Sequence, residues 1–292
     1  MKYTLLALDV DGTLHGPDHT VSDETARAVR AAEAAGLAVC LATGRSYIET
    51  LPTWRALGLT GPHQPMVLIG GALVSEADTG RTLYHKPIAR EVAVAFADAL
   101  GRAGYSPMAI VDSWRHGVDY FLSECGDVHA AQRQWFSKMN VTVRTVGRLG
   151  DVADLPPPLR ISAVVPPDAA PSLAERLKQQ FDGMLNIHPI EAPNYNVTIV
   201  EALSARADKF TALRYIAQGM RIGAGQIVAV GDDVNDITMV RGAALGVAMP
   251  HSPQPLQDAA DYQITTSLAE FITALVEGHV RSTNLESRNK SE

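Results

Sequence analysis

Residues 5–14, LLALDVDGTL, decide how the rest of the chain is organised. The first four residues are apolar and uncharged, which predicts a buried β-strand. This strand ends at two carboxylates, Asp9 and Asp11, with one residue between them. Two carboxylates this close repel each other when both are ionised, unless a cation or a shared proton lies between them. The stretch therefore predicts a metal site or an acid–base site at the end of a buried strand.

Asp9 and Asp11 are spaced so that extended backbone puts both side chains on one face. One carboxylate can attack a phosphorus atom while the other moves protons for the leaving group and the incoming water. Gly12 permits close approach of backbone to a ligand, and Thr13 offers a hydroxyl and an amide. The alternatives are a solvated acidic turn and a calcium loop. The calcium loop needs Gly at its sixth position and Glu at its twelfth, where this chain has Leu and Thr.

Composition limits the possible classes of protein. With 292 residues, 46% of them hydrophobic, the chain is long enough for two domains or for one domain with a large insertion. A formal net charge of -7 argues against nucleic acid or an anionic membrane as the main partner. The two cysteines, Cys40 and Cys125, form no disulfide framework or zinc pattern, which favours a reducing cytoplasm. No signal peptide precedes the first strand and no apolar run is long enough to span a bilayer, so we expect a soluble cytoplasmic protein.

The segment after the first strand predicts a parallel sheet. Ser22 is placed to cap an Ala-rich helix that stops at Gly36, and residues 37–42 form a second apolar strand. Strand, helix and strand in this order imply a right-handed crossover, and such sheets bind ligands beyond the carboxyl ends of their strands. Thr43 stands at such an end, where its hydroxyl and the following amides would face an anion. The alternative is a tight turn into the next helix with Arg45 on the surface.

The order of predicted strands and helices changes in the middle of the chain. A third apolar strand covers residues 66–69, and residues 85–189 then alternate short strands with helices as an α+β module. The proline run at residues 156–158 is expected to be a loop within this module rather than a boundary. We therefore expect a core domain formed by residues 1–84 and 190–280, an inserted domain formed by residues 85–189, and a disordered tail at residues 281–292.

A second acidic strand end follows the insertion. Residues 227–230 form an uncharged strand that ends in GDDVND at residues 231–236. If this strand lies beside the first, Asp232 and Asp9 converge on one cation, and oxygen ligands without His or Cys suit Mg²⁺. The alternative is a helix N-terminus with favourable acids, which accounts for only some of these residues. Lys209 begins a helix, where a cation is unfavourable unless it pairs with an anion.

Four short motifs in this order resemble those of the haloacid dehalogenase superfamily of phosphatases. They are DVDGTL at residues 9–14, LATGR at residues 41–45, Lys209, and GDDVND at residues 231–236. The position of the inserted module between the second and third motifs resembles the Cof-like, type IIB sugar phosphatase branch. The resemblance covers the chain to about Glu277. It implies a Rossmann-like, doubly wound parallel-sheet core domain with an inserted α+β cap domain.

The resemblance also implies a role for individual residues. Asp9 would be the nucleophile that forms an aspartyl-phosphate and would also ligate Mg²⁺. Asp11 would be the general acid and base, with its main-chain carbonyl on the metal, and Asp232 would be the third protein ligand.

The remaining implied roles concern the phosphate. The phosphate would be held or neutralised by Thr43 with the Gly44 amide, by Lys209 and by Asn235. Asp236 would hold these groups in position without contacting the phosphate. The implied reaction is hydrolysis of a small phosphorylated metabolite, a sugar phosphate or similar compound, by a monomer or homodimer. A phosphomutase with the same aspartyl-phosphate and a non-enzymatic phospho-acceptor or binding protein on this fold are the alternatives.

The chain departs from the usual family pattern at three places. Gly70-Gly71-Ala72 stands where relatives often have Asn-Gly-Ala, Phe210 follows Lys209 where Gly is usual, and residues 248–252 are AMPHS. None of these changes removes a catalytic group, so they bear on the substrate. The insertion offers polar and aromatic candidates for substrate contacts, but sequence alone does not show which of them face a ligand. These candidates are Trp114, Arg115, His116, Asp119, His188 and Tyr195.

Overall fold

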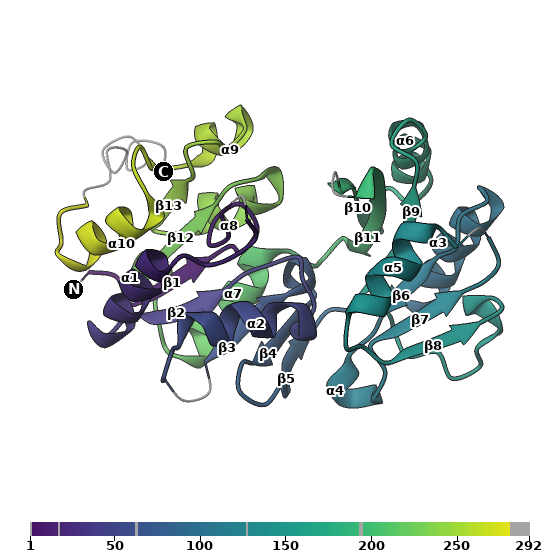
Figure 1. Cartoon of the computed structure of the whole chain (residues 1–292), viewed down its shortest axis with the longest axis horizontal. Helices are drawn as coiled ribbons and strands as arrows, with labels where there is room; N and C mark the ends of the chain where they lie inside the picture. The colour runs from purple at the N-terminus through teal and green to yellow at the C-terminus, as the bar shows by residue number, and fades with distance from the viewer. Residues whose placement is uncertain (1, 17, 62–63, 127, 193–194, 281–292) are drawn as a thin grey trace. The chain divides into compact units, whose positions relative to one another are not determined.

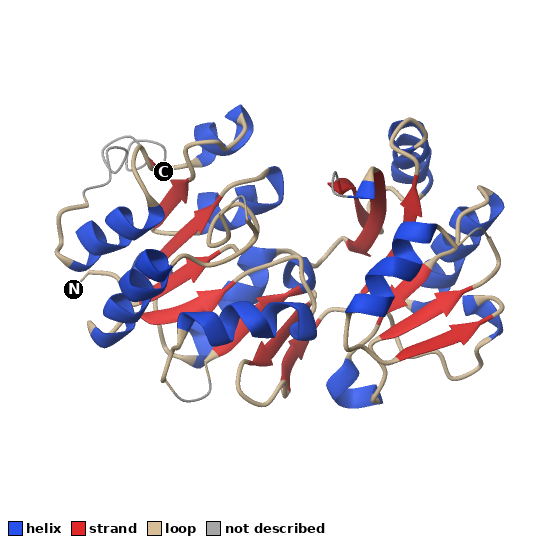
Figure 2. Cartoon of the chain, in the orientation of Figure 1, coloured by secondary structure: helices blue, strands red, loops and turns tan. Residues whose placement is uncertain are grey.

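The structure is a computed structural model that describes residues 2–16, 18–61, 64–126, 128–192 and 195–280. The expected tail at residues 281–292 lies outside the described residues. The chain divides into two compact units, one formed by Met1–Arg81 with Asp208–Glu292 and the other by Thr82–Ala207 (Figures 1 and 2). Among the described residues, no helix has the length and apolar character needed to cross a membrane.

The first unit alternates strands and helices. Its first segment contains β1 (Leu5–Leu8), α1 (Asp23–Ala34), β2 (Ala38–Leu41), α2 (Tyr47–Leu57), β3 (Pro65–Leu68), the 3₁₀ turn η1 (Ile69–Gly71) and β4 (Leu73–Glu76). Its second segment contains α7 (Lys209–Gly219), η4 (Ala224–Gln226), β12 (Ile227–Gly231), η5 (Val234–Asp236), α8 (Ile237–Gly242), β13 (Leu245–Ala248), α9 (Gln254–Ala259), β14 (Tyr262–Gln263) and α10 (Leu268–Val276).

The sheet of the first unit is parallel, with the strand order β14-β13-β12-β1-β2. β3 continues it beyond β2 through a parallel bridge between Ala42 and Val67. The chain leads from β1 to β2 in one direction along the strand order, and from β12 to β13 in the opposite direction. Because both crossovers are right-handed, α1 and α8 lie on opposite faces of the sheet. This confirms the doubly wound fold. It also makes the carboxyl ends of β1 and β12 the point where ligands bind in such sheets.

Local signals in the sequence account for the helix starts around this sheet. The Ser22 side chain accepts a hydrogen bond from the Thr25 amide at 3.1 Å and so caps α1. The Ser46 amide donates to Glu49 Oε2 at 2.9 Å at the start of α2, which is the expected capping interaction. These caps place the loops that precede α1 and α2 at the carboxyl edge of the sheet.

The second unit is an α+β domain. It contains β5 (Thr82–His85), α3 (Arg90–Arg102), β6 (Met108–Ile110), α4 (Ser113–His116), β7 (Tyr120–Ser123), α5 (Ala130–Lys138), β8 (Val143–Val146), η2 (Leu149–Asp151), β9 (Arg160–Val165), α6 (Ala170–Gln180), β10 (Leu185–Ala192) and β11 (Val197–Ser204). Its sheet has the order β10-β11-β9-β6-β7-β8, and every pair is antiparallel except β7 with β8.

The two faces of this sheet are covered differently. Alternate residues of the strands, such as Ala109, Ile161 and Val200, join α3 and α6 in a large apolar core. On the other face, Met108, Val164 and Val197 pack with residues of α5, which crosses the sheet in Figure 1. This period-two alternation is what a sheet with both faces covered requires.

The end of the inserted unit differs from the expected boundary. Residue 189 lies inside β10, which pairs with β11 along its whole length, so this hairpin belongs to the second unit. The second half of β10 contains Pro189, Ile190 and Glu191, which are exposed. β10 is the edge strand of the sheet, and an edge strand tolerates a proline because one side of it pairs with no neighbour.

Candidate active site

Asp9 and Asp232 lie at the adjacent ends of β1 and β12. The Asp9 amide donates to the Val230 carbonyl at 3.0 Å, and so prolongs the ladder between the two strands. The Thr13 hydroxyl donates to Asp232 Oδ1 at 3.3 Å. A Cβ on Gly12 would lie 2.0 Å from Asp232 Oδ2, and Gly12 has a φ of +77°. Only glycine therefore lets the loop after β1 approach the Asp232 carboxylate this closely.

Lys209 is buried between two carboxylates. Its Nζ lies 2.6 Å from Asp9 Oδ1 and 2.6 Å from Asp236 Oδ1, and its side chain is 1% exposed. Lys209 is the first residue of α7, whose start packs against the η1 turn. A Cβ on Gly71 would lie 2.1 Å from the Asp208 carbonyl oxygen, so the backbone contact there requires glycine. The unfavourable lysine at a helix start is thus explained by its two anionic partners.

Asp236 supports the site with both of its oxygens. Oδ1 accepts from Lys209, while Oδ2 accepts from the amides of Asp232 and Asp233 at 3.1 and 3.3 Å. A buried carboxylate with this many donors is held firmly in one orientation. Asp236 therefore fixes the loop after β12 and the Lys209 ammonium at the same time.

The site has one lysine and three aspartates, so it carries more negative than positive charge when all of them are ionised. Burial raises the pKa of Asp9 well above its ordinary value; the charge of Lys209 opposes this rise and that of Asp236 adds to it. Burial by itself would lower the pKa of Lys209, but the charges and hydrogen bonds of Asp236 and Asp9 raise it. Burial, with the charge of Asp236, raises the pKa of Asp232 to about 6. One ammonium thus serves three carboxylates, and a further cation would balance them.

The carboxylates fit a hard divalent cation. Asp9, Asp232 and Asp236 each offer an oxygen within 4.8 Å of the others. Because both oxygens of Asp236 already accept hydrogen bonds, Asp9 and Asp232 are the two carboxylates suited to a metal. An all-oxygen donor set of this kind suits Mg²⁺, which binds through one or two carboxylates and retains water or phosphate ligands.

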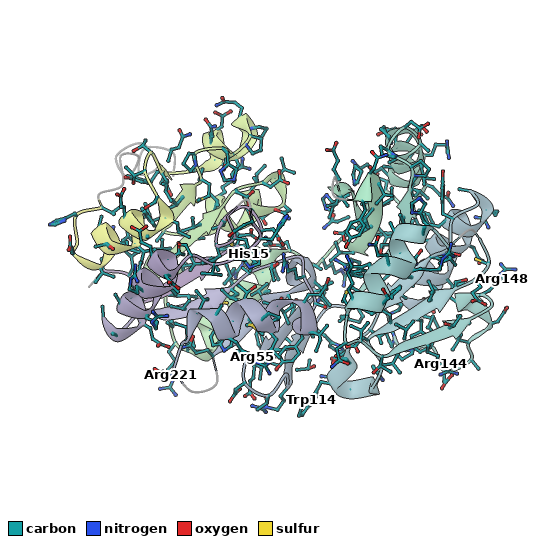
Figure 3. The ribbon with its side chains drawn as sticks, in the orientation of Figure 1. His15, Arg55, Trp114, Arg144, Arg148 and Arg221 are labelled. Carbon is teal, nitrogen blue, oxygen red and sulfur yellow. The ribbon has the colours of Figure 1, made fainter. Side chains whose placement is uncertain are left out.

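Asp11 lies apart from this buried cluster. Its side chain is 53% exposed and is held by Arg45, whose Nε donates to Asp11 Oδ2 at 2.8 Å and whose Nη2 bonds Oδ1. His15 Nδ1 lies 3.9 Å from the same carboxylate, and its Nε2 lies 2.9 Å from Thr53 Oγ1 (Figure 3). Burial, assisted by the charge of Arg45, lowers the pKa of His15.

Arg45 is the residue that sequence reasoning missed. The alternative interpretation of the turn placed Arg45 on the surface. Its side chain is instead partly buried, and two nitrogens of its guanidinium donate hydrogen bonds to Asp11. The available signal was its position directly after Thr43 and Gly44 at a strand end, where it opens the turn into α2. His251 is a second such residue, because its Nε2 lies 3.6 Å from Asp232 Oδ2.

The expected phosphate-binding residues Thr43 and Asn235 follow β2 and β12, the two strands that flank β1 in the sheet. Thr43 follows β2, is 1% exposed, and accepts from the Arg45 amide through its Oγ1 at 3.1 Å. Gly44 has open space where a Cβ would be. Asn235 is exposed in η5, one residue before Asp236. Phe210, which stands where relatives usually have Gly, lies with its ring against Gly242.

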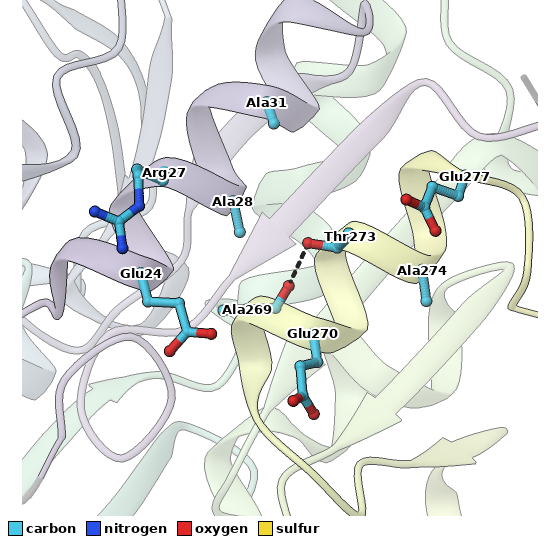
Figure 4. A pocket seen from close by; sticks show the side chains of 9 residues that line it. All are labelled: Glu24, Arg27, Ala28, Ala31, Ala269, Glu270, Thr273, Ala274 and Glu277. Atoms are coloured by element: carbon cyan, nitrogen blue, oxygen red, sulfur yellow. Dashed lines mark hydrogen bonds between the residues drawn. The ribbon is translucent and has the colours of Figure 1, made fainter.

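One cavity of the first unit lies away from these strand ends. It has a volume of about 450 Å³ and lies between α1 and α10 (Figure 4). Ala28, Ala31, Ala269 and Ala274 form much of its wall, and Thr273 Oγ1 bonds the Ala269 carbonyl inside α10. None of the residues discussed above lines it, so the chemistry of the strand ends is separate from this groove.

The sequence profile of the haloacid dehalogenase-like hydrolases matches residues 6–270 of the chain. The chain belongs to this family. It is 24% identical over 274 residues to the phosphatase YwpJ of Bacillus subtilis, with 88% of this chain and 93% of that protein covered. It is 23% identical over 283 residues to the pyridoxal phosphate phosphatase YbhA of Escherichia coli, with 93% and 98% covered.

A solved structure agrees with the fold of this haloacid dehalogenase-like hydrolase. The subclass IIB sugar phosphatase BT4131 superposes with a TM-score of 0.75 at 20% identity, and 95% of this chain and 100% of that chain are covered. The expected family and Cof-like branch are confirmed. The family and the phosphatase names of its relatives make the chain a phosphatase, that is, a phosphoric monoester hydrolase.

Proposed function

We propose that this phosphatase is Mg²⁺-dependent and hydrolyses a small phosphorylated metabolite through an aspartyl-phosphate on Asp9. The observation that carries the proposal is the buried Lys209, which binds Asp9 and Asp236 at 2.6 Å each. A lysine is buried at the cost of desolvation only where anions compensate it. Here the compensated carboxylate lies at the ligand-binding edge of a doubly wound sheet.

In the proposed reaction, a carboxylate oxygen of Asp9 attacks phosphorus and the bond from phosphorus to the ester oxygen breaks. Asp11 gives a proton to that oxygen as it leaves with the organic group. Asp11 then takes a proton from a water molecule, whose oxygen attacks phosphorus and releases inorganic phosphate and the Asp9 carboxylate. Arg45 donates to both oxygens of Asp11 in the structure, so one of these two hydrogen bonds must open when Asp11 carries the proton, while the other keeps the carboxyl group in place.

The oxygens of the phosphoryl group need donors in the proposed site. Lys209 supplies one positive charge beside Asp9, and Thr43 with the Gly44 amide supplies neutral donors from the neighbouring strand end. Asn235 supplies an amide from the loop after β12. Mg²⁺ held by Asp9, Asp232 and the Asp11 carbonyl would supply further charge on the transferring group.

Two observations bear on the substrate and on the cellular compartment. The name of the Escherichia coli relative gives a small phosphate ester, pyridoxal phosphate, as its substrate. We propose a substrate of the same size class for this chain. Cys40 and Cys125 are both free thiols, which supports the proposal that the enzyme works in a reducing cytoplasm.

The test is phosphate release from a panel of sugar phosphates, nucleotides, pyridoxal phosphate and an aryl phosphate, with Mg²⁺ and with chelator. Release that requires metal and disappears in Asp9→Asn supports the proposal. Wild-type turnover by Asp9→Asn would overturn the nucleophile assignment. Transfer of labelled phosphate to a second sugar, without release, would instead indicate a mutase.

A further inference from the structure

The second unit contains an apolar pocket that the chemistry above does not use. It lies between α5 and the sheet face opposite the large core, and has a volume of about 90 Å³. Met108, Val164 and Val197 form its floor on three adjacent strands. Trp135 of α5 and Tyr195 of the β10–β11 turn form aromatic walls. Two aromatic rings from different elements therefore face one small volume.

Trp135 is held in place by its own neighbours. Its ring lies 5.5 Å from that of Tyr120 at 84° and 4.9 Å from that of Phe136. Tyr120 is fully buried and also meets Phe136 edge-on at 5.2 Å. Edge-to-face contacts at such distances are favourable and fix ring orientation. The indole wall is thus rigid before any ligand arrives, which lowers the entropy that binding would cost.

The pocket also contains a polar group that lacks a partner. Gln132 of α5 lines the pocket and is 1% exposed. Its Nε2 makes no hydrogen bond to any of the described residues. A buried amide nitrogen without an acceptor is costly to the fold, and a ligand acceptor would remove that cost.

We propose that this pocket binds a single six-membered heteroaromatic ring that offers a hydrogen-bond acceptor to Gln132. The volume suits one ring and is too small for a fused ring system. The aromatic walls favour a flat π-system over an alkyl chain. The Gln132 amide distinguishes a ring nitrogen or carbonyl from a plain hydrocarbon ring.

Such a ring can come from the phosphate ester that the enzyme hydrolyses or from a separate ring compound. The first source rests on the proposed function, and the pocket itself does not. Binding of a phosphate-free ring therefore tests the pocket independently of the active site.

The probes are pyridine and benzene, which have nearly the same size and differ in one acceptor. Affinities for the full chain are measured by saturation-transfer NMR near pH 7.5. We expect pyridine to bind wild type about tenfold more tightly than benzene, as one hydrogen bond provides. In Gln132→Met, which keeps the volume and removes the donor, pyridine should bind no more tightly than benzene, because its ring nitrogen then loses water without gaining a donor. Gln134→Met, an exposed change on the same helix, is the control and should keep the tenfold difference.

A second variant removes the cavity itself. Ala192 lines the pocket from the end of β10, and Ala192→Phe puts a ring into the volume, so both probes should lose binding. Melting curves show that the variants are folded, and Gln132→Met should melt no lower than wild type. Failure of both probes to bind wild type, or a tenfold preference that survives in Gln132→Met, overturns the proposal.

Kinetics then separate the two sources. If the ring belongs to the substrate, Gln132→Met raises KM about tenfold for pyridoxal phosphate and leaves KM for a ring-free sugar phosphate unchanged. Unchanged KM for both esters, with pyridine still bound by wild type, assigns the pocket to a separate ring compound. No phosphate release by wild type from either ester would count against the proposed function alone, because the pyridine measurement decides the pocket.

Discussion

The two units bury polar groups in different ways. In the first unit, Lys209, Asp9 and Asp236 form a buried charged cluster at the ends of adjacent strands. In the second unit, Arg160 Nη1 lies 3.0 Å from Glu201 Oε2 in a buried ion pair, and a large apolar core packs against the sheet. Buried charges in excess of their partners destabilise a fold, whereas an apolar core stabilises it. The comparison indicates that the first unit accepts a larger electrostatic cost at its site than the apolar core of the second unit does.

The largest expected effect is on turnover. Asp9→Asn removes the nucleophile while keeping size and hydrogen bonding, so kcat should fall by at least about 10⁴-fold, as losses of nucleophiles do. Asp233→Asn is the matched control, because Asp233 is an exposed acid in the loop after the neighbouring strand β12, and it should change kcat less than threefold. Circular dichroism would check that both variants are folded. Equal losses in the two variants would mean that the total negative charge at these strand ends matters rather than Asp9.

The charged cluster predicts the second effect. Lys209→Met leaves Asp9 and Asp236 buried without their cation, so the free energy of unfolding should fall by about 3–5 kcal/mol. Urea unfolding in chelator measures it. Adding Asp236→Asn to Lys209→Met should recover part of this loss, because one uncompensated charge is then removed. A double variant less stable than Lys209→Met would contradict this account of the cluster.

The second unit offers the opposite test. Phe96 is fully buried and meets Phe181 edge-on at 5.3 Å. Phe96→Ala should lower the free energy of unfolding by about 3–5 kcal/mol through the cavity it leaves. In contrast to Lys209→Met, it should leave kcat unchanged for a small aryl phosphate at a temperature where the variant is folded. Assays at 15 °C with a folding check by circular dichroism would decide, and a loss of kcat without unfolding would weaken the comparison.

The sequence predicted those features of the fold and the site that depend on local patterns. Asp9 and Asp232 were predicted to lie at strand ends because each follows an apolar run, and Lys209 was predicted to begin a helix; these are local signals. The pairing of Arg45 with Asp11 was missed, because the direction of a long side chain depends on tertiary contacts that no local pattern contains. The end of the inserted unit was misplaced because Pro189 and its exposed neighbours in the edge strand lack the apolar alternation of a strand.

Arg45 gives a smaller effect on activity. Lysine keeps the charge but cannot supply two donors in a fixed fork, so Arg45→Lys should leave Asp11 loosely held. We expect kcat to fall about 10–100-fold, within the range of general acid–base catalysis, and KM to change little. Arg55→Lys is the control, since Arg55 is exposed on helix α2, which begins just after Arg45 (Figure 3). If the two variants behave alike, Arg45 does not position Asp11.

The smallest effect concerns a carboxylate at the surface of the first unit. Glu33 accepts from the amides of Thr60 and Gly61 at 2.9–3.2 Å and also binds Gln64. Burial acts to raise the pKa of Glu33, but these hydrogen bonds outweigh it and hold the pKa below its ordinary value. Because this carboxylate is only partly buried, Glu33→Gln should cost less than about 1 kcal/mol.

The sign of the pH dependence at Glu33 follows from that lowered pKa. The folded state binds the proton less readily than the unfolded state, so the stabilisation is complete above the unfolded pKa of about 4.3 and is lost as the pH falls through the lower folded value. The difference in unfolding free energy between wild type and Glu33→Gln should therefore be constant from pH 7 to 5 and shrink toward pH 3. Urea unfolding at each pH measures it. A difference that grows on acidification would show that Glu33 is held in its protonated form, as expected for an acid buried without enough donors.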